Sequence, residues 1–180
     1  MGPTTYSLCQ KPVIGIMMWV TSLCAFPPLF SDVPIKLAVT NATATSTFTA
    51  PVDKIYPLDI TFEFPSVEAR INDQIVGDRY IETCIGNVRY DEMPEVQKKG
   101  IGRPIPFKVV VLKAADRSIV INQTFESKCI TSHNGTEKIR TIGWLRLPVG
   151  DYVAEVTNLQ AQSDLSNVTT TISLDGGSGK

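Results

Sequence analysis

The stretch that decides the fold class runs from residue 138 to residue 159 and reads Lys-Ile-Arg-Thr-Ile-Gly-Trp-Leu-Arg-Leu-Pro-Val-Gly-Asp-Tyr-Val-Ala-Glu-Val-Thr-Asn-Leu. Side chains alternate with a period of two on both sides of the turn residues 148–151, which is typical of β-strands. A proline and a glycine between two such runs predict a β-hairpin. In its second strand Tyr152, Ala154 and Val156 share one face. In the first, Ile139, Thr141, Gly143, Leu145 and Leu147 share one face, with Ile142 and Trp144 on the other.

Further strands follow from the same pattern. Four apolar residues alternate with polar ones in the run 58–64, which predicts a strand with one buried face. The run 106–113 is almost continuously apolar and indicates a central strand, and 119–125 and 168–174 add two more. Because turn signals such as Asn-Gly separate these runs, we predict a mainly β protein. The expected architecture is an antiparallel β-sandwich of six to eight strands over residues 51–175, followed by a flexible tail at 176–180.

One segment departs from the strand pattern. Ile71, Ile75, Ile81 and Ile85 fall on one side of a helical wheel, and Gly86-Asn87 is a plausible stop. We therefore predict one short helix over residues 72–87, inserted between strands and capped at Asn72 or Asp73.

The first fifty residues resemble an export leader and a spacer. A single basic residue, Lys11, precedes about 14 mostly apolar residues, as in a secretory signal. We predict that residues 1–31 are a signal peptide or membrane anchor, and that the Thr/Ala/Ser-rich residues 32–50 are a flexible spacer that runs into a first edge strand near Ser46–Ala50. The protein is then exported and periplasmic, or anchored on the periplasmic side. Contact with the membrane is expected only through an uncleaved or lipidated N-terminus.

Cysteine usage is consistent with an oxidising compartment. Cys84 and Cys129 are the two cysteines that follow the leader, and one disulfide between them is the simplest expectation. Two buried thiols or a redox pair are the alternatives.

Three stretches resemble an uncharacterised family of bacterial envelope domains. They are Leu58–Pro65, the end of the predicted helix at Cys84–Asn87, and Gly102–Leu112 leading to Leu-Pro-Val-Gly-Asp-Tyr at 147–152. The resemblance implies an exported antiparallel sandwich and brings no known catalytic residues with it.

Catalytic, metal and cofactor motifs are not apparent in the sequence. His133 is the single histidine, so a multi-histidine metal site is excluded. The sequence contains no nucleophile elbow, phosphate loop or dinucleotide fingerprint. A net charge of −1 argues against nucleic-acid binding. We therefore expect no enzyme activity, no metal and no cofactor.

Two functions remain as hypotheses. The first is a non-catalytic protein-binding domain of the bacterial envelope, of which an immunity-type inhibitor of a secreted effector is one form. The second is a carbohydrate-binding or adhesive module that uses Trp144. The polar stretch 90–103 is the expected partner-binding surface because binding residues concentrate on loops. Its candidate residues are Tyr90, Asp91, Glu92, Glu95, Lys98, Lys99 and Arg103.

Overall fold

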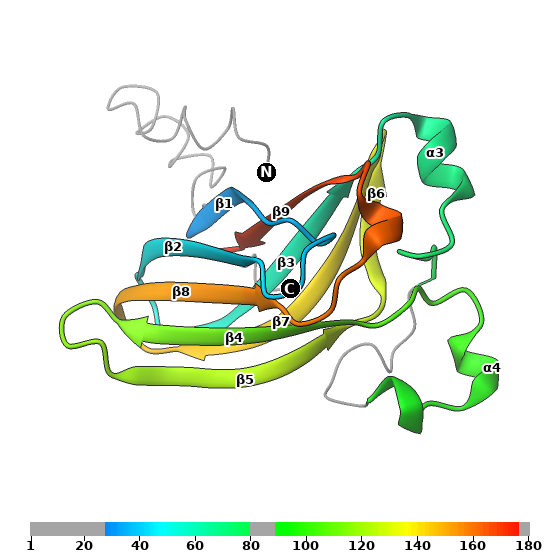
Figure 1. The fold of residues 1–180 in the computed structure, drawn as a ribbon. Coiled ribbons are helices and arrows are strands. Elements are labelled where there is room, and N and C mark those ends of the chain that lie inside the picture. Colours follow the sequence, from blue (N-terminus) through cyan, green and yellow to red (C-terminus); the bar gives the residue numbers. More distant parts are fainter. Residues whose placement is uncertain (1–27, 80–88, 177–180) are drawn as a thin grey trace, which may run out of the picture.

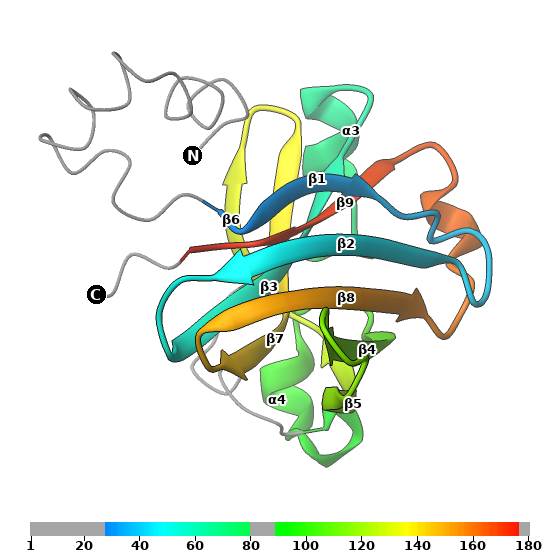
Figure 2. The same cartoon turned by 90° about the vertical axis from the view of Figure 1, so that its left-hand side faces the viewer.

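Two antiparallel sheets form a β-sandwich in the computed structural model, which describes residues 28–79 and 89–176 (Figure 1). The five-stranded sheet has the order β1-β9-β3-β7-β6, and the four-stranded sheet has the order β2-β8-β4-β5. Figure 2 shows the two layers from a perpendicular direction. The strands are β1 (Phe30–Pro34), β2 (Thr43–Ala50), β3 (Lys54–Glu63), β4 (Ile105–Lys113), β5 (Ile119–Ser127), β6 (Ile130–Asn134), β7 (Glu137–Leu147), β8 (Gly150–Asn158) and β9 (Thr169–Leu174).

The predicted fold class is confirmed, and so are most of the predicted inward faces. Leu58, Ile60 and Phe62 of β3 are completely buried, as their alternation with polar residues required. β4 lies between β8 and β5, so the continuous apolar run is indeed a central strand. Burying the facing apolar sides of two sheets removes them from water, which is the main force that holds such a sandwich together.

The predicted hairpin at residues 138–159 is wrong. β7 pairs with β3 and β6 in one sheet, whereas β8 pairs with β2 and β4 in the other. The chain crosses from one sheet to the other at Pro148-Val149. Leu147 therefore lies in the five-stranded sheet and Tyr152 in the four-stranded sheet, and both side chains are buried in the core. Tyr152 is 2% exposed and its hydroxyl donates a hydrogen bond to the Pro148 carbonyl at 3.0 Å, as in the tyrosine corner of sandwich folds.

A β-bulge in β7 changes which of its residues face the core. Leu58 lies opposite Gly143 but Asp59 lies opposite Thr141, so β7 has one extra residue at this point. Leu145 and Leu147 point inward as predicted. Before the bulge the faces are reversed, because Lys138, Arg140 and Ile142 are buried whereas Ile139 and Thr141 are only partly buried.

The predicted edge strand near Ser46–Ala50 is present as part of β2, at one edge of the four-stranded sheet, but residues 32–50 as a whole are not a spacer, because β1 and β2 are integral strands. β1 pairs with β9 at one edge of the five-stranded sheet. β2 pairs with β8 along its whole length, from Thr43 opposite Thr157 to Ala50 opposite Gly150. β1 also begins at Phe30, inside the predicted leader, whose residues 1–27 lie outside the described part of the chain. With these strands the described residues form nine strands, one more than the predicted upper number.

The connection from β3 to β4 crosses between the sheets at one end of the sandwich. It contains α3 (Val67–Asn72), the 3-10 helix η2 (Tyr90–Glu92) and α4 (Glu95–Lys98); a second 3-10 helix, η3 (Ser163–Leu165), precedes β9. Ser66 caps α3, since its hydroxyl accepts a hydrogen bond from the Ala69 backbone N–H. The predicted helix start at Asn72 or Asp73 is therefore wrong, because a helix ends there. The remainder of that prediction, residues 80–88, lies outside the described chain.

Within the described residues, no helix has the length and apolar character needed to cross a membrane.

Candidate functional site

The predicted partner-binding residues lie on two separate surfaces. Seven of them belong to residues 89–103, which we call the end segment because it covers one end of the sandwich. Trp144 lies instead on the outer face of the five-stranded sheet, on β7.

A small hydrophobic cluster anchors the end segment to the sandwich. Met93 is 3% exposed and Ile101 is 7% exposed, and both pack on Cys129, with Tyr90 against the cluster. The backbone N–H of Tyr90 also donates to the carboxylate of Glu126 at 3.0 Å. The end segment is therefore a folded part of the domain rather than a polar loop. The signal in the sequence was its two isolated apolar residues, Met93 and Ile101, which form no periodic pattern and were therefore not recognised as buried.

The basic residues of the end segment are used partly within the molecule. Lys98 donates to Glu95 at 2.7 Å and lies over the ring of Tyr90, 5.2 Å from its centroid. The hydrogen bond with Glu95 raises the pKa of Lys98. Arg103 pairs with Asp164 of η3 at 2.8 Å. Lys99, in contrast, is exposed, and its side chain makes no ion pair within the part of the chain that is described.

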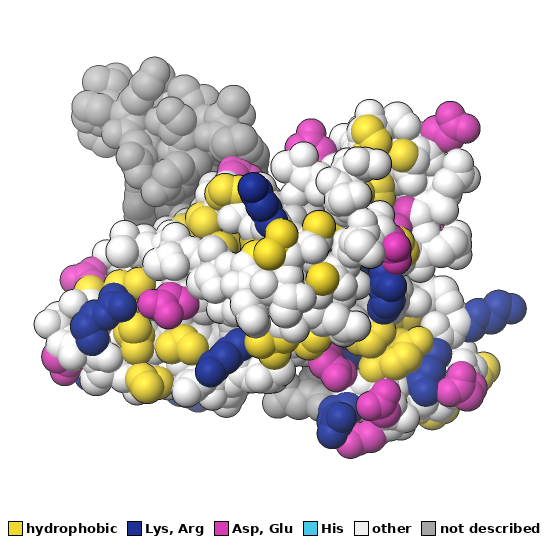
Figure 3. Space-filling model, viewed as in Figure 1, with side chains coloured by type: hydrophobic (Ala, Val, Ile, Leu, Met, Phe, Trp, Pro, Cys, Tyr) yellow, Lys and Arg dark blue, Asp and Glu magenta, His cyan; other side chains and the backbone are white. Residues whose placement is uncertain are grey.

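The outward side of the end segment combines one apolar residue with charges of both signs. Val96 on α4 is 78% exposed, the most exposed large apolar side chain among the described residues. Figure 3 shows Lys, Arg, Asp and Glu side chains gathered over the region where Figure 1 places α4. The other exposed residues of the end segment are Arg89, Asp91, Glu92, Pro94, Glu95, Lys99, Gly100 and Arg103.

Two buried cations hold the chain on either side of the end segment, and the sequence analysis did not anticipate them. Lys138 is 0% exposed, and its amine lies 2.9 Å from the carboxylate of Asp73 and 2.8 Å from that of Asp78. Arg140 is also 0% exposed. It donates to the carbonyls of Val76 and Arg103 at 3.0 Å, with longer bonds to those of Ser127 and Ile75. We call these two side chains the cationic clamp.

Burial and backbone shape both act on the clamp. Desolvation lowers the pKa of Arg140 to about 9, which the charge of Asp73 partly opposes. Gly102 makes room for the guanidinium, because a Cβ there would lie 1.9 Å from Arg140 Nη2. The clamp therefore joins the segment 73–79, residue 103 and the end of β5 to one strand.

Trp144 is 49% exposed and lies opposite Pro57 of β3. Ile55 and Arg146 form the neighbouring cross-strand pair, and Ile55 is 53% exposed. On the other side of Pro57, Thr141 donates a hydrogen bond of 2.8 Å to the carboxylate of Asp59. Burial raises the pKa of Asp59 to about 6; the Thr141 hydrogen bond opposes this shift and the charge of Asp175 adds to it.

The predicted disulfide is only half within the described chain. Cys129 is 4% exposed in the cluster under the end segment. Cys84 lies among residues 80–88, outside the described part, so the pairing of the two cysteines stays a prediction.

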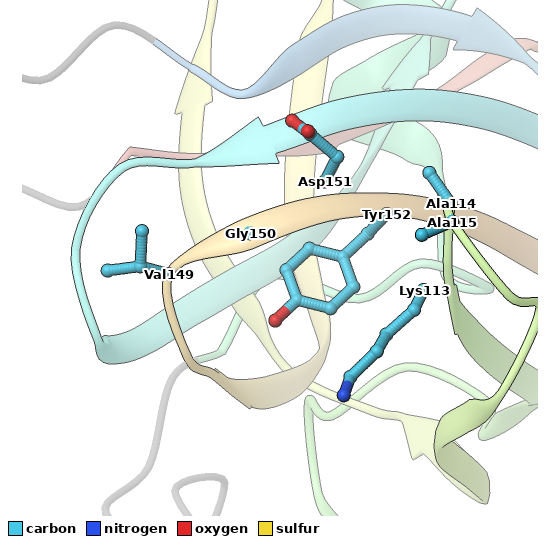
Figure 4. A pocket seen from close by; sticks show the side chains of 7 residues that line it. All are labelled: Lys113, Ala114, Ala115, Val149, Gly150, Asp151 and Tyr152. Carbon is cyan, nitrogen blue, oxygen red and sulfur yellow. The ribbon is translucent and has the colours of Figure 1, made fainter.

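A shallow hollow of about 510 Å³ lies between the β4–β5 turn and the crossover from β7 to β8 (Figure 4). Lys113 and Tyr152 point to one side of β8 and Asp151 to the other. Two of these side chains already have hydrogen-bond partners: the Tyr152 hydroxyl donates to the Pro148 carbonyl, and Asp151 accepts from Thr49 at 2.6 Å. Elsewhere His133 is exposed on β6, and the described residues contain no cluster of three or more His, Cys, Asp and Glu suited to a metal.

Comparisons with known proteins identify a family and a fold. A family model described as a domain of unknown function, DUF5625, matches residues 32–176. A crystal structure of GEBA250068378 from Sulfurospirillum deleyianum is similar, with a TM-score of 0.58 and 16% identity, over 83% of this chain and 98% of that one. At that identity the likeness concerns the fold alone. The search of curated proteins found no match.

Proposed function

We propose that this chain, which belongs to the DUF5625 family of domains of unknown function, is an exported, non-catalytic protein-binding domain of the bacterial cell envelope. Its partner is another protein, which contacts the end segment. An immunity-type inhibitor that blocks a secreted effector is one form of such a domain.

One observation carries the proposal: the end segment is anchored on its inner side and exposed on its outer side. Its residues Met93 and Ile101 are buried against the sandwich, while its Val96 is 78% exposed among charged residues. Association costs free energy whenever mobile side chains and loops become ordered. A segment already folded by its own cluster has paid most of that cost, so its exposed residues are suited to contact a partner.

The mixed charges support a protein partner over a polyanion or a membrane. The end segment carries Arg89, Lys98, Lys99 and Arg103 as well as Asp91, Glu92 and Glu95, so neither sign dominates. Such a pattern selects a partner with complementary charges and repels others, which contributes to specificity and to the rate of association. Export rests on the apolar run that follows Lys11, and the non-catalytic character rests on the motifs that the sequence lacks.

Site-specific photo-crosslinking in intact cells tests the proposal. A crosslinking amino acid at position 96 is expected to capture one discrete envelope protein. The same group at Thr45, on the outer face of the four-stranded sheet, is the control and is expected to capture no protein. Lys99→Glu should weaken the capture at position 96 and leave the melting temperature within about 2 °C, since surface substitutions have small effects. Equal capture from both positions, or capture insensitive to Lys99→Glu, contradicts the proposal.

A further inference from the structure

The β-bulge in β7 places two side chains on one face that a regular strand would put on opposite faces. Thr141 and Trp144 are three residues apart, an odd number, so strict alternation would point them in opposite directions. Because β7 has an extra residue between Thr141 and Gly143, both lie on the outer face of the five-stranded sheet. Bulges recur beside functional sites, where they redirect a side chain.

The result is an aromatic ring beside hydrogen-bonding groups. Trp144 lies opposite Pro57, and Asp59 follows two residues later on the same face, about 7 Å along the strand. Asp59 is flanked by Thr141 on β7 and by Ser173 on β9. One carboxylate oxygen of Asp59 accepts the Thr141 hydroxyl, and no hydrogen bond to its other oxygen is found among the described residues.

This combination matches the chemistry of a sugar ring. A pyranose has an apolar face of C–H groups that packs on an indole, and its rim carries hydroxyls that donate and accept hydrogen bonds. Among the described residues Asp59 makes no ion pair with a cation: its strand neighbours on this face are Pro57, Thr61, Thr141 and Ser173, and the nearby charge that acts on it, Asp175, is also negative. Hydroxyl donors satisfy a partly buried carboxylate without bringing a charge, so a neutral ligand fits better than an anionic one.

We propose that the outer face of the five-stranded sheet around Trp144 and Asp59 binds a chain of neutral hexopyranose sugars. Trp144 stacks on one sugar ring, and Asp59 accepts a hydrogen bond from a hydroxyl of the same or the next ring. Thr141 orients the carboxylate through its own hydrogen bond. This site is separate from the end segment and does not depend on the protein-binding function.

Trp144 itself reports on the proposed site. The chain has two tryptophans, Trp19 and Trp144, so Trp19→Phe in the full chain leaves one indole. Titration with cellohexaose, maltohexaose and chitohexaose is expected to give a saturable change in Trp144 emission with at least one of them, at submillimolar concentration. No saturable change with any of the three overturns the proposal.

Variants measured by calorimetry locate the binding. Trp144→Ala should abolish it, and Asp59→Ala should weaken it about tenfold or more, the usual effect of losing a hydrogen bond to a charged group. Trp144→Phe keeps an aromatic face and is expected to retain weaker binding, which guards against a misfolded alanine variant. Lys99→Glu, on the end segment, leaves glycan binding unchanged. Sugar binding that survives both alanine variants overturns the proposal. So does a Trp144→Ala variant that binds sugar as before but no longer captures the protein that is crosslinked at position 96.

Discussion

The end segment and the outer face of the five-stranded sheet around Trp144 and Asp59, which we call the Trp144 face, are both exposed. Different interactions hold each of them in place. The end segment, at 89–103, depends on long-range contacts: buried Met93 and Ile101, and the cationic clamp that fixes the chain beside it. The Trp144 face depends on strand register, with one bulge as its special feature. The difference indicates that changes in the core should disturb the end segment first and leave the Trp144 face largely intact.

The largest expected effect comes from Arg140→Ala. This change leaves the carbonyls of Val76, Arg103 and Ser127 buried without their donor, so we expect a loss of about 3–5 kcal/mol in the free energy of unfolding. Denaturant unfolding measures it. Arg146→Ala is the matched control on the same strand, because the Arg146 side chain is 78% exposed and should cost no more than about 0.5 kcal/mol. Similar losses in the two variants would show that the clamp does not stabilise the fold.

The second effect concerns the predicted disulfide. If Cys84 and Cys129 are bonded, the bridge closes a loop of about 45 residues and Cys129→Ala should cost about 2–4 kcal/mol. Mass spectrometry after alkylation without reduction is expected to find neither cysteine alkylated in folded, exported protein. Alkylation of both thiols would refute the pairing and leave the cluster beneath the end segment as its main anchor.

The Trp144 face should show its own pH signature, through Asp59. The folded-state pKa of about 6 lies above the ordinary value near 4, so folded protein retains a proton between these pH values that unfolded protein releases. Asp59 therefore makes the fold more stable as the pH falls from 6 to 4, and less stable above 6.

Asp59→Asn removes this dependence. Relative to wild type, the variant is expected to gain about 1–2 kcal/mol in the free energy of unfolding between pH 4 and pH 7, a value reduced for partial exposure to solvent. Thermal unfolding of both proteins at several pH values checks this. An identical pH dependence in the two would show that Asp59 has an ordinary pKa.

The smallest effect is expected from Lys98→Ala on the end segment. Its ion pair with Glu95 and its contact with Tyr90 lie at the surface, where solvent screens such interactions and they contribute little to stability. Thermal unfolding measures it, with Lys99→Ala as the neighbouring control that should change nothing. A loss of several kcal/mol from Lys98→Ala would mean that the end segment is held by its surface charges rather than by its buried cluster.

Particular residues show where sequence reasoning succeeded and where it failed on the candidate sites. The alternation placed Trp144 on the face of its strand away from Leu145 and Leu147, and the structure shows that the side chain is exposed there. Asp59 lies on the polar face of its strand, as the alternation in the run 58–64 predicts, but its neighbours bury it in part. The inward positions of Lys138 and Arg140 were unforeseeable, because charged residues are rarely buried unless paired. Their partners are backbone carbonyls and carboxylates far away in the sequence.

The sequence by itself determined the strands and, for most of them, the face that each one buries. These properties are local, since successive side chains of a strand point to opposite sides and apolar ones avoid water. Only the tertiary structure decided which strands pair. The run at 138–159 has the same local pattern whether Pro148-Val149 closes a hairpin or crosses between sheets, and the choice depends on whether Leu147 and Tyr152 bury more apolar surface within one sheet or across two.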